Sequence, residues 1–67
     1  MLPPQSFTHR ALQLAAQGEP IPINENVSQL LPGLLWSGHF TDFTYEGLHV
    51  FASLTEKGRA FLAWLES

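Results

Sequence analysis

Histidines are the residues of this 67-residue chain whose spacing most directly tests for metal chemistry. His9, His39 and His49 are never three or four residues apart, and the chain has no cysteine that could complete a metal site. His39 and His49 fall in a segment with strand periodicity, so one interpretation pairs them across a hairpin as a two-ligand or pH-sensitive site. The other treats all three as ordinary, partly exposed histidines. We predict no metal ion and no cofactor.

Carboxylates and hydroxyls give no stronger sign of catalysis. Asp42 and Glu46 form the only plausible acid–base pair, but they flank a predicted turn, where side chains are usually solvated, and no third group accompanies them. Ser37 and Ser53 have no base that spacing can identify. The chain is therefore predicted not to be an enzyme.

The balance of charge argues against nucleic acid as the main partner. The only cations are Arg10, Lys57 and Arg59, and six carboxylates bring the net charge to −3. Because affinity for nucleic acid depends largely on Lys and Arg neutralising phosphates, this composition makes a poor phosphate-binding surface.

Composition also bears on location. No stretch approaches the roughly 20 apolar residues that cross a bilayer, and residues 1–4 lack the basic region and apolar run of a secretion signal. The absence of cysteine fits a reducing compartment. We expect a cytoplasmic protein without a membrane segment.

The length predicts one domain, residues 1–67, with residues 1–5 as a flexible, proline-rich arm. A chain of this size buries only about 60% of its unfolded surface, so it depends on dense packing or on oligomerisation. Apolar residues make up 45% of the chain, which is enough to collapse into a core.

The amino-terminal half predicts two helices with a short extended segment between them. Ser6 is the expected N-cap of a helix over residues 7–17, and Gly18 ends it. The helical spacing places four residues on its buried face, Phe7, Ala11, Leu14 and Ala15, and points four elsewhere, His9, Arg10, Gln13 and Gln17. Two prolines make residues 19–24 extended, as a short edge segment.

The second helix is predicted from a capping box. Asn26 followed three residues later by Gln29 is typical of a helix start, and Ser37–Gly38 ends the element. Its apolar residues are Val27, Leu30, Leu31, Leu34 and Leu35. Pro32 lies in the middle, so the element is expected to be either kinked or divided into two short turns.

From residue 39 to residue 54 the period becomes two, which predicts a β-hairpin with its turn at Tyr45–Gly47. One strand would carry His39, Thr41, Phe43 and Tyr45 on one face, and the other would carry Leu48, Val50, Ala52 and Leu54. Phe40 and Phe51 would lie on the opposite faces. Both sides of the hairpin would then present large apolar groups.

The last predicted helix begins after Thr55, its N-cap. Leu54, Phe61, Leu62 and Leu65 form its expected inner seam. Gly58 is expected to allow close packing of this helix against the hairpin. Trp64 is either the edge of the core or an exposed anchor.

The run Leu54-Thr55-Glu56-Lys57-Gly58-Arg59-Ala60-Phe61-Leu62 resembles the exit from the wing of winged-helix repressors of the MarR and PadR kind. Upstream, Leu34-Leu35-Trp36-Ser37-Gly38-His39-Phe40 resembles the end of their recognition helix. The match covers roughly residues 34–66. The resemblance implies an α+β, winged-helix-like domain of three helices with a β-hairpin in its carboxyl-terminal half.

Three departures from that family shape the functional hypotheses. Val27–Ser37, at the position of the recognition helix, contains no Arg, Lys or Asn, which are the side chains that usually read base edges. The wing at Thr44–Gly47 is acidic. Residues 19–26 hold no separate helix, so the helix-turn-helix is reduced.

Our leading hypothesis is a small regulatory protein that acts through protein–protein contact, with another protein or a second copy of the chain as its partner. By general analogy, small phage and prophage proteins that inhibit a host factor share this length and acidity. The predicted protein-binding residues are the acidic and aromatic side chains Phe43, Tyr45, Glu46, Phe51 and Trp64.

The alternative hypothesis is a reduced winged-helix DNA-binding regulator. In that interpretation the three cations, Arg10, Lys57 and Arg59, contact phosphates, and Ser28 and Gln29 face the groove.

Overall fold

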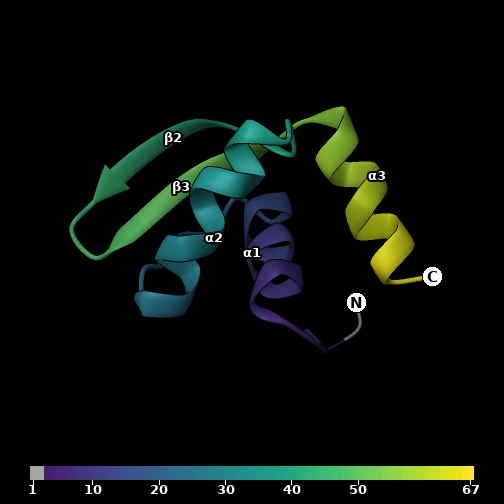
Figure 1. Cartoon of the computed structure of the whole chain (residues 1–67), viewed down its shortest axis with the longest axis horizontal. Coiled ribbons are helices and arrows are strands. Elements are labelled where there is room, and N and C mark those ends of the chain that lie inside the picture. The colour runs from purple at the N-terminus through teal and green to yellow at the C-terminus, as the bar shows by residue number, and fades with distance from the viewer. Residues whose placement is uncertain (1–2) are drawn as a thin grey trace.

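The computed structural model describes residues 3–67, which alternate helices with strands of a single sheet (Figure 1). The elements are α1 (Phe7–Ala16), β1 (Ile21–Pro22), α2 (Glu25–Trp36), β2 (Phe40–Glu46), β3 (His49–Leu54) and α3 (Glu56–Leu65). The sheet is antiparallel with strand order β1-β3-β2. The predicted α+β class, with three helices and a hairpin in the carboxyl-terminal half of residues 3–67, is confirmed.

The predicted flexible arm is only partly visible, because residues 1–2 lie outside the described part of the chain. Residues 3–5 have no regular structure, yet the Gln5 backbone N–H donates a hydrogen bond to His9 Nδ1 at 3.3 Å. Within residues 3–67 no helix has the length and hydropathy needed to cross a bilayer.

Helix α1 begins as predicted, with Ser6 Oγ accepting the His9 backbone N–H at 3.1 Å. Ala11, Leu14 and Ala15 are buried as predicted, but the prediction is wrong for Phe7 and for two polar residues. Phe7 is 51% exposed, whereas the polar residues His9 and Gln13 are buried together with Leu12. The physical reason is that α1 packs against α2 and the sheet on one side and against α3 on another, so more than one stripe of the helix is covered.

Helix α2 starts two residues earlier than the capping box predicts. Asn24 is the N-cap, and its Oδ1 accepts the Val27 backbone N–H at 2.9 Å, so the predicted pairing of Asn26 with Gln29 is wrong. The helix is a single element with Pro32 inside it, which rules out two separate turns. Pro32 lies on the exposed side, where water can take the carbonyl that loses its helical partner.

The hairpin differs from the predicted one at its turn and in its first strand. The turn is Gly47–Leu48, with Gly47 at φ 60°, so Leu48 lies at the tip and does not share the face of Val50. The register of β2 on β3 shifts between Thr41 and Thr44, where Asp42 adopts φ 56°. This bulge adds a residue to one strand and therefore reverses which side chains face the core beyond it.

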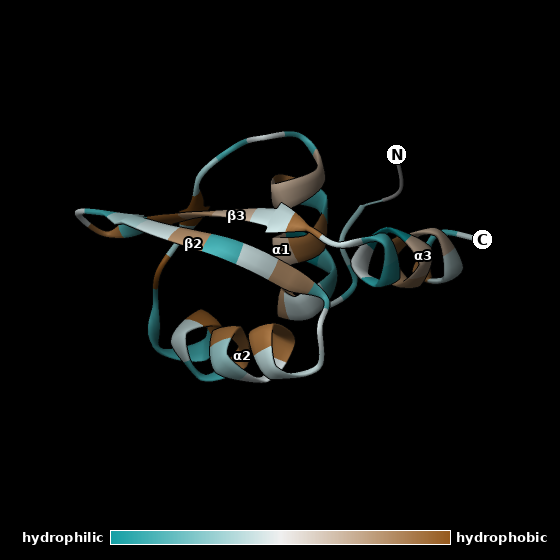
Figure 2. Cartoon of the chain, turned by 90° about the horizontal axis from the view of Figure 1, so that it is seen from above, coloured by the Kyte–Doolittle hydropathy of each residue, from teal (hydrophilic) through white to brown (hydrophobic). Residues whose placement is uncertain are grey.

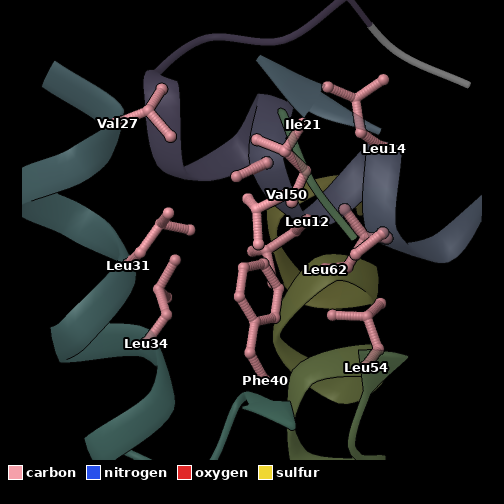
Figure 3. Packing of buried hydrophobic residues seen from close by; sticks show 12 residues of the cluster. Leu12, Leu14, Ile21, Val27, Leu31, Leu34, Phe40, Val50, Leu54 and Leu62 are labelled. Atoms are coloured by element: carbon pink, nitrogen blue, oxygen red, sulfur yellow. The ribbon is translucent and has the colours of Figure 1, made fainter. Parts of the chain in front are cut away.

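Phe40 shows the consequence of the bulge. It was predicted to lie opposite Phe43, but the two rings are on the same side and in contact. Phe40 is 1% exposed and lies at the centre of the core, between Leu31 and Leu34 of α2 and the residues of the sheet (Figure 3).

Helix α3 confirms the expectations for its first turn. Thr55 Oγ1 accepts the Gly58 backbone N–H at 3.1 Å, and the Thr55 hydroxyl donates to the Gly38 carbonyl. A side chain at position 58 would collide with the His39 carbonyl oxygen, so Gly58 does permit close packing on the base of the hairpin. In the inner seam Leu62 is buried, and Phe61 and Leu65 pack half-buried against the core. Figure 2 shows α2 beside the hairpin and α3 beyond its base.

Candidate protein-binding surface

Three aromatic rings form a continuous series on the core side of the hairpin, which we name the aromatic ladder: Phe40, Phe43 and Tyr45. The centroids of Phe40 and Phe43 are 5.9 Å apart at 67°, and those of Phe43 and Tyr45 are 6.4 Å apart at 89°. Both pairs are edge-to-face, the arrangement that aromatic quadrupoles favour. Phe40 is fully buried, Phe43 is half-buried and Tyr45 is 62% exposed, so the ladder runs from the core to solvent.

The strand geometry explains how these rings come together. Phe43 and Tyr45 are two residues apart and share a face of β2, while the bulge at Asp42 brings Phe40 onto that same face. Tyr45 pairs with Val50, which is completely buried, and this confirms that the shared face is the one that covers the core.

The hairpin tip begins at the last ring of the ladder, and we define it as Tyr45, Glu46, Gly47 and Leu48. Leu48 is 77% exposed and Glu46 is exposed. The Leu48 carbonyl accepts the Ile23 backbone N–H at 2.8 Å, which holds the tip against the segment that precedes α2. Figure 1 shows the tip projecting beyond the helices on the side of α2.

The five predicted protein-binding residues separate into three places. Phe43 and Tyr45 lie together on the core face of β2, whereas Glu46, the next residue along the strand, alternates to the outer face. Phe51 pairs with Thr44 on the outer face of the sheet, away from the ladder. Trp64 is 69% exposed on α3, where it stacks on Phe61 with ring centroids 5.9 Å apart, so it lies outside the core and its role as an anchor stays a prediction.

The residues predicted for DNA binding are not gathered on one surface. Arg10 borders Asn24 and Val27 at the start of α2, whereas Lys57 Nζ donates to the Ser37 carbonyl at its end, at 2.8 Å. Ten helical residues separate these two positions, a distance of roughly 15 Å. Arg59 is exposed two residues after Lys57, so it points to the other side of α3.

The polar residues proposed for the DNA groove, Ser28 and Gln29, are both exposed on α2. The Ser28 hydroxyl donates to the Glu25 carbonyl of its own helix at 3.1 Å. Because α2 itself carries no Arg or Lys, no cation accompanies these two side chains on the helix.

The histidine pairing across the hairpin is wrong. His49 pairs with Glu46 beside the tip, while His39 lies just before β2, at the base, where its Nδ1 is hydrogen-bonded to Ser37 Oγ. The pairing fails because the turn is two residues long and places positions 46 and 49 opposite each other. The part of the chain that the structure describes contains no group of three side chains able to hold a metal ion.

The two carboxylates weighed for acid–base work, Asp42 and Glu46, are both exposed, as expected for residues near a turn. Asp42 occupies the bulge and Glu46 the end of β2, at most about 13 Å apart along a strand.

A polar cluster, which sequence reasoning missed, ties α1 to the end of α3: the buried His9 and Gln13 and the half-buried Glu66. Glu66 Oε2 accepts the Gln13 Nε2–H at 2.7 Å and lies 3.2 Å from His9 Nε2. Because the Gln5 N–H donates to His9 Nδ1, the ring proton is placed on Nε2, from which it donates to Glu66. Hydrogen bonds from Gln13 and His9 hold the pKa of the Glu66 carboxyl below its ordinary value.

This cluster contains a histidine and a carboxylate, as many catalytic pairs do, but its histidine is not accessible to a substrate. His9 is 2% exposed, and both of its ring nitrogens are engaged within the molecule. The i, i+4 spacing of His9 and Gln13 places them on one side of α1, and this was the available sequence signal. Glu66, more than 50 residues away, carried no such signal.

Comparison with protein-family models, with curated proteins and with solved structures finds no match for this chain.

Proposed function

We propose that this chain is a small, non-enzymatic regulatory protein that acts in the cytoplasm by binding another protein. The aromatic ladder and the hairpin tip are the binding element. The observation that carries the proposal is the exposure of Tyr45, whose ring rests edge-on against Phe43 and through it against the core.

A ring held in this way is suited to recognition. Tyrosine is enriched among the residues that dominate binding energies, because it combines large apolar area with a hydrogen-bonding group. A side chain that is already ordered loses less conformational entropy when a partner covers it. The neighbouring Glu46 adds a charge that selects the orientation of the partner.

A role like that of small phage or prophage proteins that inhibit or redirect a host factor fits this profile. The winged-helix resemblance stays a prediction from the sequence, and the structure has one helix, α2, between β1 and the hairpin. The DNA-binding alternative is less well supported, because α2 lacks cations and Arg10 lies far from Lys57.

The test is an affinity pull-down of the tagged chain from nuclease-treated lysate at low and high salt. We expect to recover a stoichiometric protein partner, and we expect Tyr45→Ala to lower the affinity for that partner about tenfold. Trp36→Ala is the matched control, because Trp36 is 90% exposed but lies at the end of α2, outside the ladder. Recovery of nucleic acid alone when nuclease is omitted, lost as salt rises, contradicts the proposal and favours the DNA-binding regulator.

A further inference from the structure

A groove lies between α1, β1 and the start of α2, and we name it the Phe7 groove. It consists of a shallow, open depression of about 470 Å³ beside residues 4–6 and a deeper hollow of about 220 Å³, and the two share Phe7 and Arg10. The smaller hollow is lined by the apolar side chains of Ala11, Leu14, Ile21 and Val27. Because drug-sized ligands occupy roughly 300–1,000 Å³, this hollow suits single side chains better than a cofactor.

Arg10 sets the charge that an occupant of the groove must carry. It is the only cation of the chain outside α3, and over residues 3–67 no carboxylate lies within ion-pair distance of it. Its neighbour Phe7 is half exposed although it is large and apolar. The groove therefore fits a segment that brings a carboxylate between large apolar side chains.

The hairpin tip of the chain itself has this composition. Tyr45 and Leu48 are exposed apolar groups, and Glu46, which stands between them in the sequence, has no ion-pair partner in the described residues. Within one molecule Arg10 and Glu46 form no ion pair. The cation of Arg10 and the carboxylate of Glu46 could therefore pair with each other across two copies of the chain.

The groove and the tip are also neighbours on the surface. Ile23, between Pro22 and Asn24 of the groove lining, donates its backbone N–H to the Leu48 carbonyl of the tip. Two complementary patches that lie side by side on one molecule suit a two-fold axis, because each copy then offers its tip to the groove of the other. The contact is made twice and the assembly closes at two copies.

We propose that the chain forms a two-fold dimer in which the hairpin tip of each copy occupies the Phe7 groove of the other. Glu46 pairs with Arg10, and Tyr45 and Leu48 enter the depression and the hollow on either side of Phe7. The dimer rests on the proposed function, since it uses the same hairpin as the binding element, and it covers Tyr45 until a protein partner displaces the second copy.

The test is sedimentation equilibrium of the full chain and of charge-reversed variants. The wild-type chain is expected to dimerise, and Arg10→Glu and Glu46→Arg are each expected to raise the dimer dissociation constant about tenfold, because each change acts at both contacts. The double variant R10E/E46R restores the ion pair and is expected to return to within about threefold of the wild type. Arg59→Glu is the control, since it makes the same change of charge on exposed α3.

The dimer is overturned if the wild-type chain stays monomeric at millimolar concentration, if the double variant associates as weakly as the single variants, or if Arg59→Glu weakens association equally. The pull-down separates this result from the proposed function. An Arg10→Glu chain that is monomeric but still retains a protein partner supports both proposals. A monomeric wild type that captures a partner only while Arg10 is present overturns the dimer and assigns the groove to that partner.

Discussion

The two ends of this molecule treat their side chains in opposite ways. Where α1 meets the end of α3, the side chains of His9 and Gln13 both donate hydrogen bonds to Glu66. At the hairpin tip, Tyr45 and Leu48 face solvent. In residues 3–67 no buried side-chain polar atom lacks a hydrogen-bond partner. The polar side chains where α1 meets α3 find their hydrogen-bond partners within the chain, whereas the apolar side chains of the hairpin tip have no partner within it that covers them.

The aromatic ladder contains both a buried ring and an exposed ring within a single strand. Phe40 is part of the core and Tyr45 is part of the surface, although the rings are chemically similar and lie only one ring apart. The difference shows that burial, and not residue type, decides whether an aromatic side chain stabilises the fold or is available for binding. Substitutions at the two ends of the ladder should therefore act on different quantities.

The largest expected effect comes from Phe40→Ala. Removing a fully buried ring lowers the free energy of unfolding by roughly 3–5 kcal/mol, a large fraction of the stability of a domain this small. Tyr45→Ala is expected to cost less than about 1 kcal/mol, since its ring is mostly solvated. Urea denaturation of both variants checks the contrast, and equal losses of stability contradict it.

Substitutions of two glycines are expected to change the free energy of unfolding by an intermediate amount. Gly58→Ala places a methyl group against the His39 carbonyl oxygen and Leu54, and should lower the free energy of unfolding by roughly 1–3 kcal/mol. Gly33→Ala is the matched control, because nothing lies within 4 Å of its Cβ position and alanine favours a helix.

The control should raise the free energy of unfolding by up to about 1 kcal/mol. Thermal unfolding of both variants, followed by circular dichroism, provides the measurement. A Gly58→Ala protein as stable as Gly33→Ala would show that α3 does not rest closely on the base of the hairpin.

Local signals predicted much of this fold. Ser6 and Thr55 cap helices because a hydroxyl before an apolar, helix-forming run satisfies the first backbone donors, and this rule needs no tertiary information. The hairpin follows in the same way from a period of two, and the close approach at Gly58 from a glycine in the first turn of a helix.

The errors arise where distant residues decide the outcome. The bulge at Asp42 inverts the facing of Phe40, and a strict period of two cannot detect an inserted residue. Asn24 prevails over Asn26 as the N-cap because β1 pairs with β3 and ends just before it. His9 is buried because α3 covers it with Glu66, a contact between residues 57 positions apart.

The candidate site was predicted in part for the same reason. Phe43 and Tyr45 are two residues apart in one strand, so their shared face follows from the sequence, and Glu46 follows Tyr45 directly on the opposite face. Phe51 and Trp64 were grouped with them by residue type alone, and the sheet register places Phe51 on the opposite face. Composition predicts how many aromatic side chains a small domain carries, but only the register tells which of them share a surface.

The smallest expected effect concerns the cluster of His9, Gln13 and Glu66, and it is seen in the pH dependence of the free energy of unfolding. Because its hydrogen bonds lower the pKa of Glu66 in the folded chain, ionised Glu66 stabilises the fold above the ordinary carboxyl pKa of roughly 4.3. That contribution disappears as the pH falls through the lower pKa of the folded state, where the carboxyl takes up a proton. Glu66→Gln is therefore expected to lower the free energy of unfolding at pH 7, and its difference from the wild type is expected to shrink as the pH falls below the ordinary carboxyl pKa.

Denaturant unfolding of the wild type and of Glu66→Gln between pH 3 and pH 7 measures this difference. Glu19→Gln is the control, because Glu19 is exposed and makes no ion pair in the part of the chain that the structure describes. If both variants keep the full acid sensitivity of the wild type, Glu66 is not held by His9 and Gln13 in solution. The α1–α3 end would then resemble the hairpin tip, with polar groups that the molecule leaves to solvent, and the contrast between the two ends would fail.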